Sequence, residues 1–93
     1  MNIPAAFSQL LVWLDFETLY AFPESEPDPI GFALEQLSAS DRMVVKQFLI
    51  NALETLQAPK QLEELHRDAG ARTYFENEQG LRAYLKEIVR KAT

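Results

Sequence analysis

The stretch from Ser40 to Leu56 constrains the fold of this chain most strongly, because its apolar residues recur with the period of an α-helix. These residues are Val45, Phe48, Leu49, Ala52, Leu53 and Leu56. The polar residues between them fall on the opposite side of such a helix, whereas a β-strand would bury every second residue. We therefore expect a core helix over residues 41–57, with Ser40 as its N-cap.

Four further helices are predicted from the same apolar spacing and from boundary signals. The first is expected over residues 4–14, and the sequence leaves open whether residues 15–22 prolong it. Asp28 and Asn77 are the expected N-caps of the second and fifth helices, and Gly70 is expected to end the fourth in the left-handed conformation. A chain of 93 residues is long enough for one hydrophobic core and too short for two. We therefore expect an all-α, single compact domain over residues 1–93, with about five helices packed around the core helix.

The composition narrows the possible classes of function. The chain has no cysteine, which excludes disulfides, thiolate zinc sites and a cysteine nucleophile. It shows no basic segment followed by an apolar run at its start, and no apolar stretch as long as a membrane span. Its net charge of −5 disfavours nucleic-acid binding, because phosphate groups are bound by clustered lysine and arginine. We expect a cytoplasmic protein that binds neither membrane nor nucleic acid.

The charge is distributed unevenly along the chain. The first 41 residues contain seven acidic side chains and no lysine or arginine, whereas residues 42–93 contain nine basic and seven acidic side chains. A surface of one sign steers a partner of the opposite sign and raises its association rate. The sequence therefore favours a basic protein partner.

Residues 13–28 combine large aromatic side chains with carboxylates, and the end of this segment is rich in proline and is predicted to be a loop. Aromatic residues dominate binding hot spots, and carboxylates pair well with arginine. Alternatively, the aromatic residues complete the core while the acidic residues are solvated. The candidate contacts are Trp13, Phe16 and Tyr20 as apolar anchors, and Asp15, Glu17, Glu24, Glu26 and Asp28 as electrostatic contacts.

The sequence shows no constellation typical of an enzyme. His66 is the only histidine, and together with Glu63 it has the Glu-x-x-His spacing of helical metal sites, but the sequence contains no second such pair. We interpret His66 as an ordinary surface or half-buried histidine and expect no catalytic residue, cofactor or metal. The alternative, an enzyme, would need chemistry around His66.

A basic strip is predicted on the last helix. It consists of Arg82, Lys86, Arg90 and Lys91. Cations near a helix C-terminus offset the helix dipole, and we prefer this interpretation to nucleic-acid contact. On the same helix, Glu78 with Arg82 and Glu87 with Lys91 have the spacing of favourable ion pairs.

A set of short motifs follows the predicted helices in order. They are Asp15-Phe16, the acidic proline-containing loop, Ser38-Ala39-Ser40-Asp41-Arg42, Leu62-Glu63-Glu64-Leu65, Gly70 and Tyr84-Leu85-Lys86-Glu87-Ile88. This order resembles the small helical immunity proteins of bacterial contact-dependent growth inhibition systems. The resemblance implies a cytoplasmic protein that binds and neutralises the C-terminal domain of a cognate toxin, many of which are nucleases with basic grooves. A non-enzymatic helical adaptor or subunit is the alternative, and the sequence leaves homo-oligomerisation open.

Overall fold

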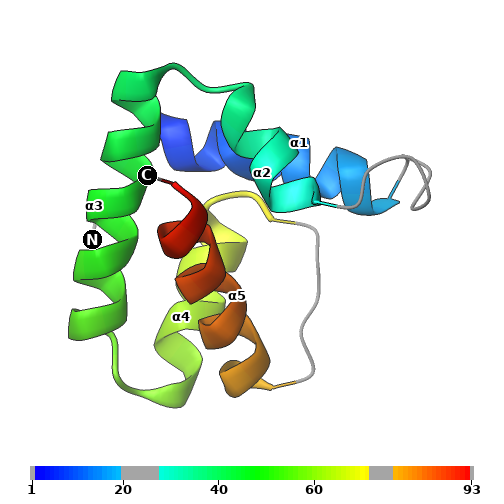
Figure 1. Cartoon of the computed structure of the whole chain (residues 1–93). Helices are drawn as coiled ribbons and strands as arrows, with labels where there is room; N and C mark the ends of the chain where they lie inside the picture. Colours follow the sequence, from blue (N-terminus) through cyan, green and yellow to red (C-terminus); the bar gives the residue numbers. More distant parts are fainter. Residues whose placement is uncertain (1, 20–27, 72–76, 93) are drawn as a thin grey trace.

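Five α-helices make up the described part of the chain, which contains no strand (Figure 1). The computed structural model describes residues 2–19, 28–71 and 77–92, and the side chains of all of these except residues 16–19 and 59. The helices are α1 (Ala5–Leu19), α2 (Pro29–Glu35), α3 (Ala39–Thr55), α4 (Pro59–Asp68) and α5 (Glu78–Lys91). The predicted all-α fold of about five helices is confirmed.

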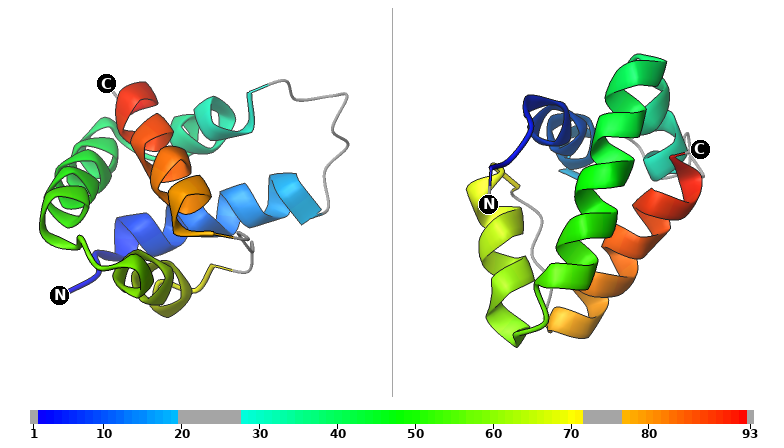
Figure 2. Two further views of the ribbon diagram at one scale, coloured as in Figure 1. Left: turned by 90° about the horizontal axis from the view of Figure 1, so that it is seen from below. Right: turned by 90° about the vertical axis from the view of Figure 1, so that its left-hand side faces the viewer.

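Helices α3 and α5 lie side by side and run in opposite directions, while α1 extends across their axes (Figures 1 and 2). Helix α5 also packs against α2 and α4, and α1 packs against α2 and α3. The radius of gyration is 12.4 Å, close to the value of about 12 Å for a compact domain of this length. The core helix predicted from the sequence therefore shares its central place with α5.

The hydrophobic core receives side chains from all five helices. In α3 the buried residues are Val45, Leu49 and Ala52, which belong to the predicted apolar stripe, and Phe48 and Leu53 are partly buried against them. The other helices bury residues at the same helical spacing. The buried apolar residues are Phe7, Leu10, Leu11, Leu14, Ala33, Leu34, Leu37, Val45, Leu49, Ala52, Leu62, Leu65, Ala69, Leu81, Leu85, Ile88 and Ala92.

Two helices have other boundaries than predicted. Helix α1 continues for five residues beyond its predicted end, because residues 15–19 contain no proline or glycine that would stop it. Helix α3 is capped by Ser38, whose side chain accepts a hydrogen bond from the backbone N–H of Asp41 at 3.1 Å. Ser40, the predicted cap, lies exposed in the first turn. The core helix therefore spans residues 39–55 instead of 41–57.

Three predicted helix ends are confirmed. Asp28 accepts a hydrogen bond from Gly31 N–H at 3.1 Å, and Asn77 accepts one from Gly80 N–H at 2.8 Å. Gly70 has a φ of 98°, in the left-handed region that favours glycine. Around it, the N–H groups of residues 70 and 71 donate to the carbonyls of residues 67 and 66, which is the Schellman pattern. The chain thereby turns away from α4.

Arg82 joins α5 to the C-terminal end of α3. Its Nη1 donates to the carbonyl of Leu53 at 3.1 Å, and its Nη2 to the carbonyl of Leu56 at 2.8 Å. Its Nε lies 2.6 Å from a carboxylate oxygen of Glu78, which confirms that predicted pair. Helix α3 has no basic residue in its own last turn, so Arg82 supplies the positive charge that its C-terminus favours.

Candidate functional site

The structure describes the side chains of three predicted contact residues, namely Trp13, Asp15 and Asp28. The backbone at positions 16 and 17 belongs to α1, and the side chains there are outside the described set. Tyr20, Glu24 and Glu26 lie outside the described residues. Their contacts stay a prediction.

Asp15 lies inside the protein instead of on the partner surface predicted for it. Its residue is 7% exposed, and it interacts electrostatically with His66 of α4 and Tyr84 of α5. The extension of α1 beyond Leu14 carries this carboxylate into the core region, on the side of the helix that Leu11 and Leu14 share. In this conformation Asp15 is unavailable to a partner.

The prediction that His66 is a surface or half-buried residue is wrong, because this residue is only 5% exposed. Burial lowers the pKa of His66, and the nearby Asp15 opposes this effect. Burial, with a smaller contribution from Asp15, raises the pKa of Tyr84 to about 12. At neutral pH the imidazole and the phenol are therefore both favoured in their uncharged forms. We name the buried Asp15 and His66, together with the partly buried Tyr84, the buried polar cluster; its residues lie on α1, α4 and α5.

Trp13 contributes to the contact between α1 and α2. It is half-buried, and its ring meets the ring of Phe32 edge to face, with the centroids 6.3 Å apart and an interplanar angle of 74°. The alternative that the aromatic residues complete the core is therefore correct in part for Trp13, which is partly buried against it. The rest of its surface stays accessible.

Asp28 has two roles within the fold. It caps α2, and its carboxylate lies 2.6 Å from Nζ of Lys91 at the end of α5. The hydrogen bond from Lys91, followed by that from Gly31 N–H, lowers the pKa of Asp28. Gly31 permits this arrangement, since a Cβ at that position would lie 2.3 Å from Oδ2 of Asp28. Asp28 thus ties the start of α2 to the last turn of α5.

Val12 is a surface residue that the sequence analysis does not single out. It is 66% exposed, more than any other large hydrophobic residue that the structure describes. Ten of the fifteen residues of α1 are apolar, and the helix contains no lysine or arginine. In the part of α1 whose side chains are described, the exposed residues are Ala5, Gln9 and Val12, so Val12 is the one large apolar side chain exposed there.

Most of the predicted basic strip on α5 is occupied by internal contacts. Arg82 binds the end of α3, Arg90 pairs with Glu87, and Lys91 pairs with Asp28. Glu87 and Lys91, predicted to pair, form no salt bridge, because Lys91 reaches Asp28 instead. The hydrogen bond from Arg90, and more weakly the charge of Lys91, lowers the pKa of Glu87, so an electrostatic attraction between Glu87 and Lys91 remains. These contacts leave little free positive charge for a phosphate backbone.

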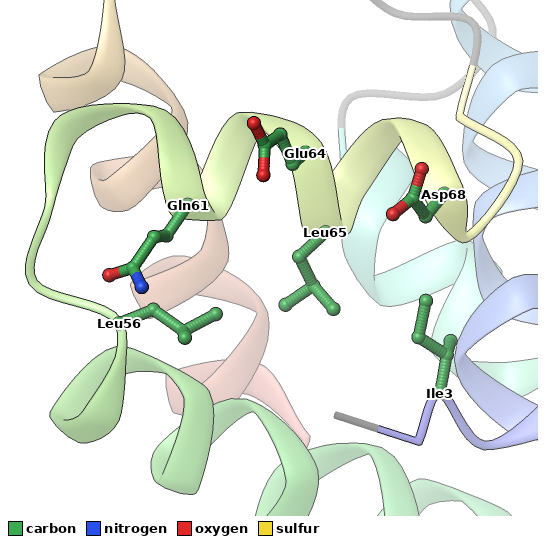
Figure 3. A pocket seen from close by; sticks show the side chains of 6 residues that line it. All are labelled: Ile3, Leu56, Gln61, Glu64, Leu65 and Asp68. Carbon is green, nitrogen blue, oxygen red and sulfur yellow. The ribbon is translucent and has the colours of Figure 1, made fainter.

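A small hollow lies between α4 and the segment that precedes α1 (Figure 3). Its volume is about 190 Å³, below the roughly 300 to 1,000 Å³ typical of ligand pockets. Its lining residues are Ile3, Leu56, Gln61, Glu64, Leu65 and Asp68.

Within the described ranges, no group of three or more histidine, cysteine or acidic residues has the arrangement of a metal site. None of the helices described here has the length and apolar character needed to span a membrane.

No protein-family model, curated protein or solved structure matches this chain. Its function is therefore inferred from its own residues and their geometry.

Proposed function

We propose that this chain is an immunity protein that binds a basic, nuclease-type toxin domain in a one-to-one complex and blocks its active site in the cytoplasm. The observation that carries the proposal is the separation of charge, with seven acidic and no basic side chains in the first 41 residues. Where these carboxylates are exposed and unpaired, they attract a protein whose own groove is built to bind phosphate. The resemblance of the motifs to helical immunity proteins supplies the class of partner.

The fold leaves part of this acidic charge free of internal ion pairs. Glu35 at the end of α2 and Asp41 in the first turn of α3 take part in none of the ion pairs between described residues. Glu35 is also exposed. By contrast, Arg42, the first cation of the chain, is partly buried and donates to the carbonyl of Leu34 at 3.4 Å. The negative charge of Glu35 and Asp41 is thus available to a partner.

The buried or engaged residues are removed from the proposed contact set. Asp15 belongs to the buried polar cluster, and Asp28 is held by α2 and Lys91. We retain the remaining acids of the segment as electrostatic contacts and its aromatic residues as anchors. The retained residues are Glu17, Glu24 and Glu26, together with Trp13, Phe16 and Tyr20.

The proposal is tested with the protein encoded by the gene immediately upstream, which the proposal predicts to carry a basic toxin domain. Its nuclease activity is measured on plasmid DNA and on RNA while this protein is added in increasing amounts. We expect the activity to disappear at a one-to-one ratio. Full activity in the presence of excess protein would contradict the proposal, and a stable homodimer in sizing experiments would then favour the adaptor.

A further inference from the structure

The hollow beside α4 combines an apolar floor with an acidic rim (Figure 3). Leu65 is buried and points from α4 into the space between Leu56 and Ile3, which are both partly buried against the core. Glu64 and Asp68 are exposed and lie one turn apart along the α4 side of the hollow. A ligand that fits this arrangement has an apolar portion for the floor and a positive charge for the rim.

The contacts of the fold hold the walls of the hollow in place. The carbonyl of Leu56 accepts a hydrogen bond from Arg82 at 2.8 Å, and the N–H of Leu56 donates to the carbonyl of Ala52. Gln61 Oε1 accepts the N–H of Ala58 at 3.0 Å, which fixes this side chain at the start of α4. The hollow therefore exists before a ligand arrives, and less conformational freedom is lost on binding.

The two rim carboxylates are unfavourably placed in the free protein. Glu64 and Asp68 are separated by four positions on one helix, the spacing at which like charges repel. Asp68 is also the last residue of α4, where the helix dipole disfavours a negative charge. None of the salt bridges between described residues includes either of them. A cation bound between them would relieve the repulsion and would lie at the negative end of the dipole.

The volume of the hollow favours a single side chain over a larger ligand. The hollow measures about 190 Å³, and a cavity of about 150 Å³ is already large enough for benzene. Among side chains that join a positive charge to an aliphatic stem, arginine suits two carboxylates best, because its planar guanidinium donates five hydrogen bonds in a fork. The lysine ammonium is a more strongly hydrated point charge. Arginine is also enriched among the residues that dominate protein interfaces.

We propose that this hollow receives an arginine side chain of the basic partner, with its aliphatic stem against Leu65 and its guanidinium between Glu64 and Asp68. Arginine commonly buries its stem on an apolar surface while the charged group stays at the edge. This inference rests on the proposed function, and it adds a binding site on α4 to the acidic residues near the N-terminus. The site lies within residues 42–93, where basic side chains outnumber acidic ones and total charge gives no indication of it.

The first test uses arginine itself as the probe, in the form of N-acetyl-arginine amide. N-acetyl-citrulline amide is the matched control ligand, because it has nearly the same shape and carries no charge. Each compound is added at millimolar concentration, and the methyl NMR signals of Ile3, Leu56 and Leu65 report on the hollow.

Two double variants separate the rim from the total charge. The rim variant is Glu64→Gln with Asp68→Asn, and the control variant is Glu54→Gln with Glu63→Gln. Both remove two negative charges, but Glu54 and Glu63 are exposed and do not line the hollow. Thermal unfolding checks the fold, and the rim variant should be at least as stable as the wild type, because it loses a repulsive pair.

We expect the arginine compound to shift these methyl signals of the wild type in a saturable manner, and the citrulline compound to leave them unchanged. The rim variant should bind the arginine compound about tenfold more weakly or worse, because the charge-assisted hydrogen bonds are lost. The control variant should stay within about twofold of the wild type, since charges away from the contact are screened. An equal response to citrulline, or equal weakening in both variants, would overturn the inference.

The second test measures the affinity of the same variants for the protein encoded immediately upstream. We expect the rim variant to bind it about tenfold more weakly than the wild type, and the control variant within about twofold. If the rim variant binds and neutralises that protein as tightly as the wild type does, the arginine site is refuted while the immunity function stands. If the wild type does not neutralise it but binds the arginine compound at the rim, the arginine site stands and the immunity function is refuted.

Discussion

Burial determines the protonation of His66, the one histidine of the chain. Its imidazole is buried on α4 and interacts electrostatically with the Asp15 carboxylate of α1, which also interacts with Tyr84 of α5. Removal from water disfavours the charged imidazolium more than the Asp15 carboxylate favours it, and the pKa of His66 is therefore lowered. The folded protein thus binds this proton less readily than the unfolded chain does.

This difference predicts how stability depends on pH. Above the ordinary histidine pKa of about 6.5 both states are neutral at this position, and the folded state keeps its full stability. As the pH falls through this value, the unfolded chain takes up the proton first, so the free energy of unfolding decreases. We expect urea unfolding curves to show this decrease in the wild type, and a smaller one in His66→Gln.

A single NMR resonance provides the control, because the chain has one imidazole. The Cε1–H signal of His66 should titrate below the usual value, and at a still lower pH in Asp15→Asn, which removes the opposing negative charge. Asp41→Asn, on α3, should leave this titration in place. A higher pKa of His66 in Asp15→Asn would contradict the buried polar cluster.

At the scale of single elements, the start of α3 shows how one serine is selected over another. Ser38 has extended backbone angles, φ −65° and ψ 160°, and its Oγ accepts the N–H of Asp41, the third residue of the helix. Ser40 is already within the helix, where a serine side chain has no capping role. In the sequence both serines precede the same acidic residue, and either assignment places Asp41 in the first turn.

The two serines give a matched pair of variants. We expect Ser38→Ala to lower the free energy of unfolding by about 1 kcal/mol, the typical loss for an N-cap. Ser40→Ala should be neutral or slightly stabilising, because alanine is the better helix former at an exposed position. Urea unfolding at neutral pH measures both. If Ser40→Ala lowered the free energy of unfolding as much as Ser38→Ala, the assignment of Ser38 as the N-cap would be contradicted.

The helices and their buried residues could be predicted from the sequence wherever one side of a helix is apolar and the other polar. In α3 and α5 this contrast reports burial directly, and the residues expected inside, such as Leu49 and Leu85, are buried. Helix α1 has no such contrast, because apolar residues occur all round it. The spacing of Phe7, Leu10, Leu11 and Leu14 correctly predicted the buried side of α1, but it left open where the helix ends and whether Val12, which lies off that stripe, widens the buried face.

At the scale of the whole molecule, the residues whose roles were mistaken are those with partners far along the chain. Lys91 pairs with Asp28 across 63 positions, and Asp15 meets His66 through the packing of α1 near α4. No local pattern contains such information. As a result, the sequence predicted Asp28 correctly as the cap of α2, but it also predicted Asp15 and Asp28 as contacts to a partner and missed that the fold buries the first and pairs the second with Lys91.

The position of the acidic charge, separate from its total, leads to the last prediction. Reversing Glu24 and Glu26 to lysine changes the net charge from −5 to −1, and so does reversing Glu54 and Glu63, which are exposed in the second half of the chain. Asp28 is left unchanged, because it caps α2 and holds Lys91. The two double variants therefore differ in where the charge is altered and not in how much.

If the N-terminal acidic segment steers the basic toxin domain, the Glu24 and Glu26 variant should associate about tenfold more slowly at low salt, and the Glu54 and Glu63 variant within about twofold of the wild type. The difference should shrink at high salt, because exposed charges are screened over a short distance. Stopped-flow mixing with the neighbouring toxin domain at two salt concentrations measures these rates. Equal slowing in both variants would mean that only net charge matters, and no slowing in either would exclude electrostatic steering.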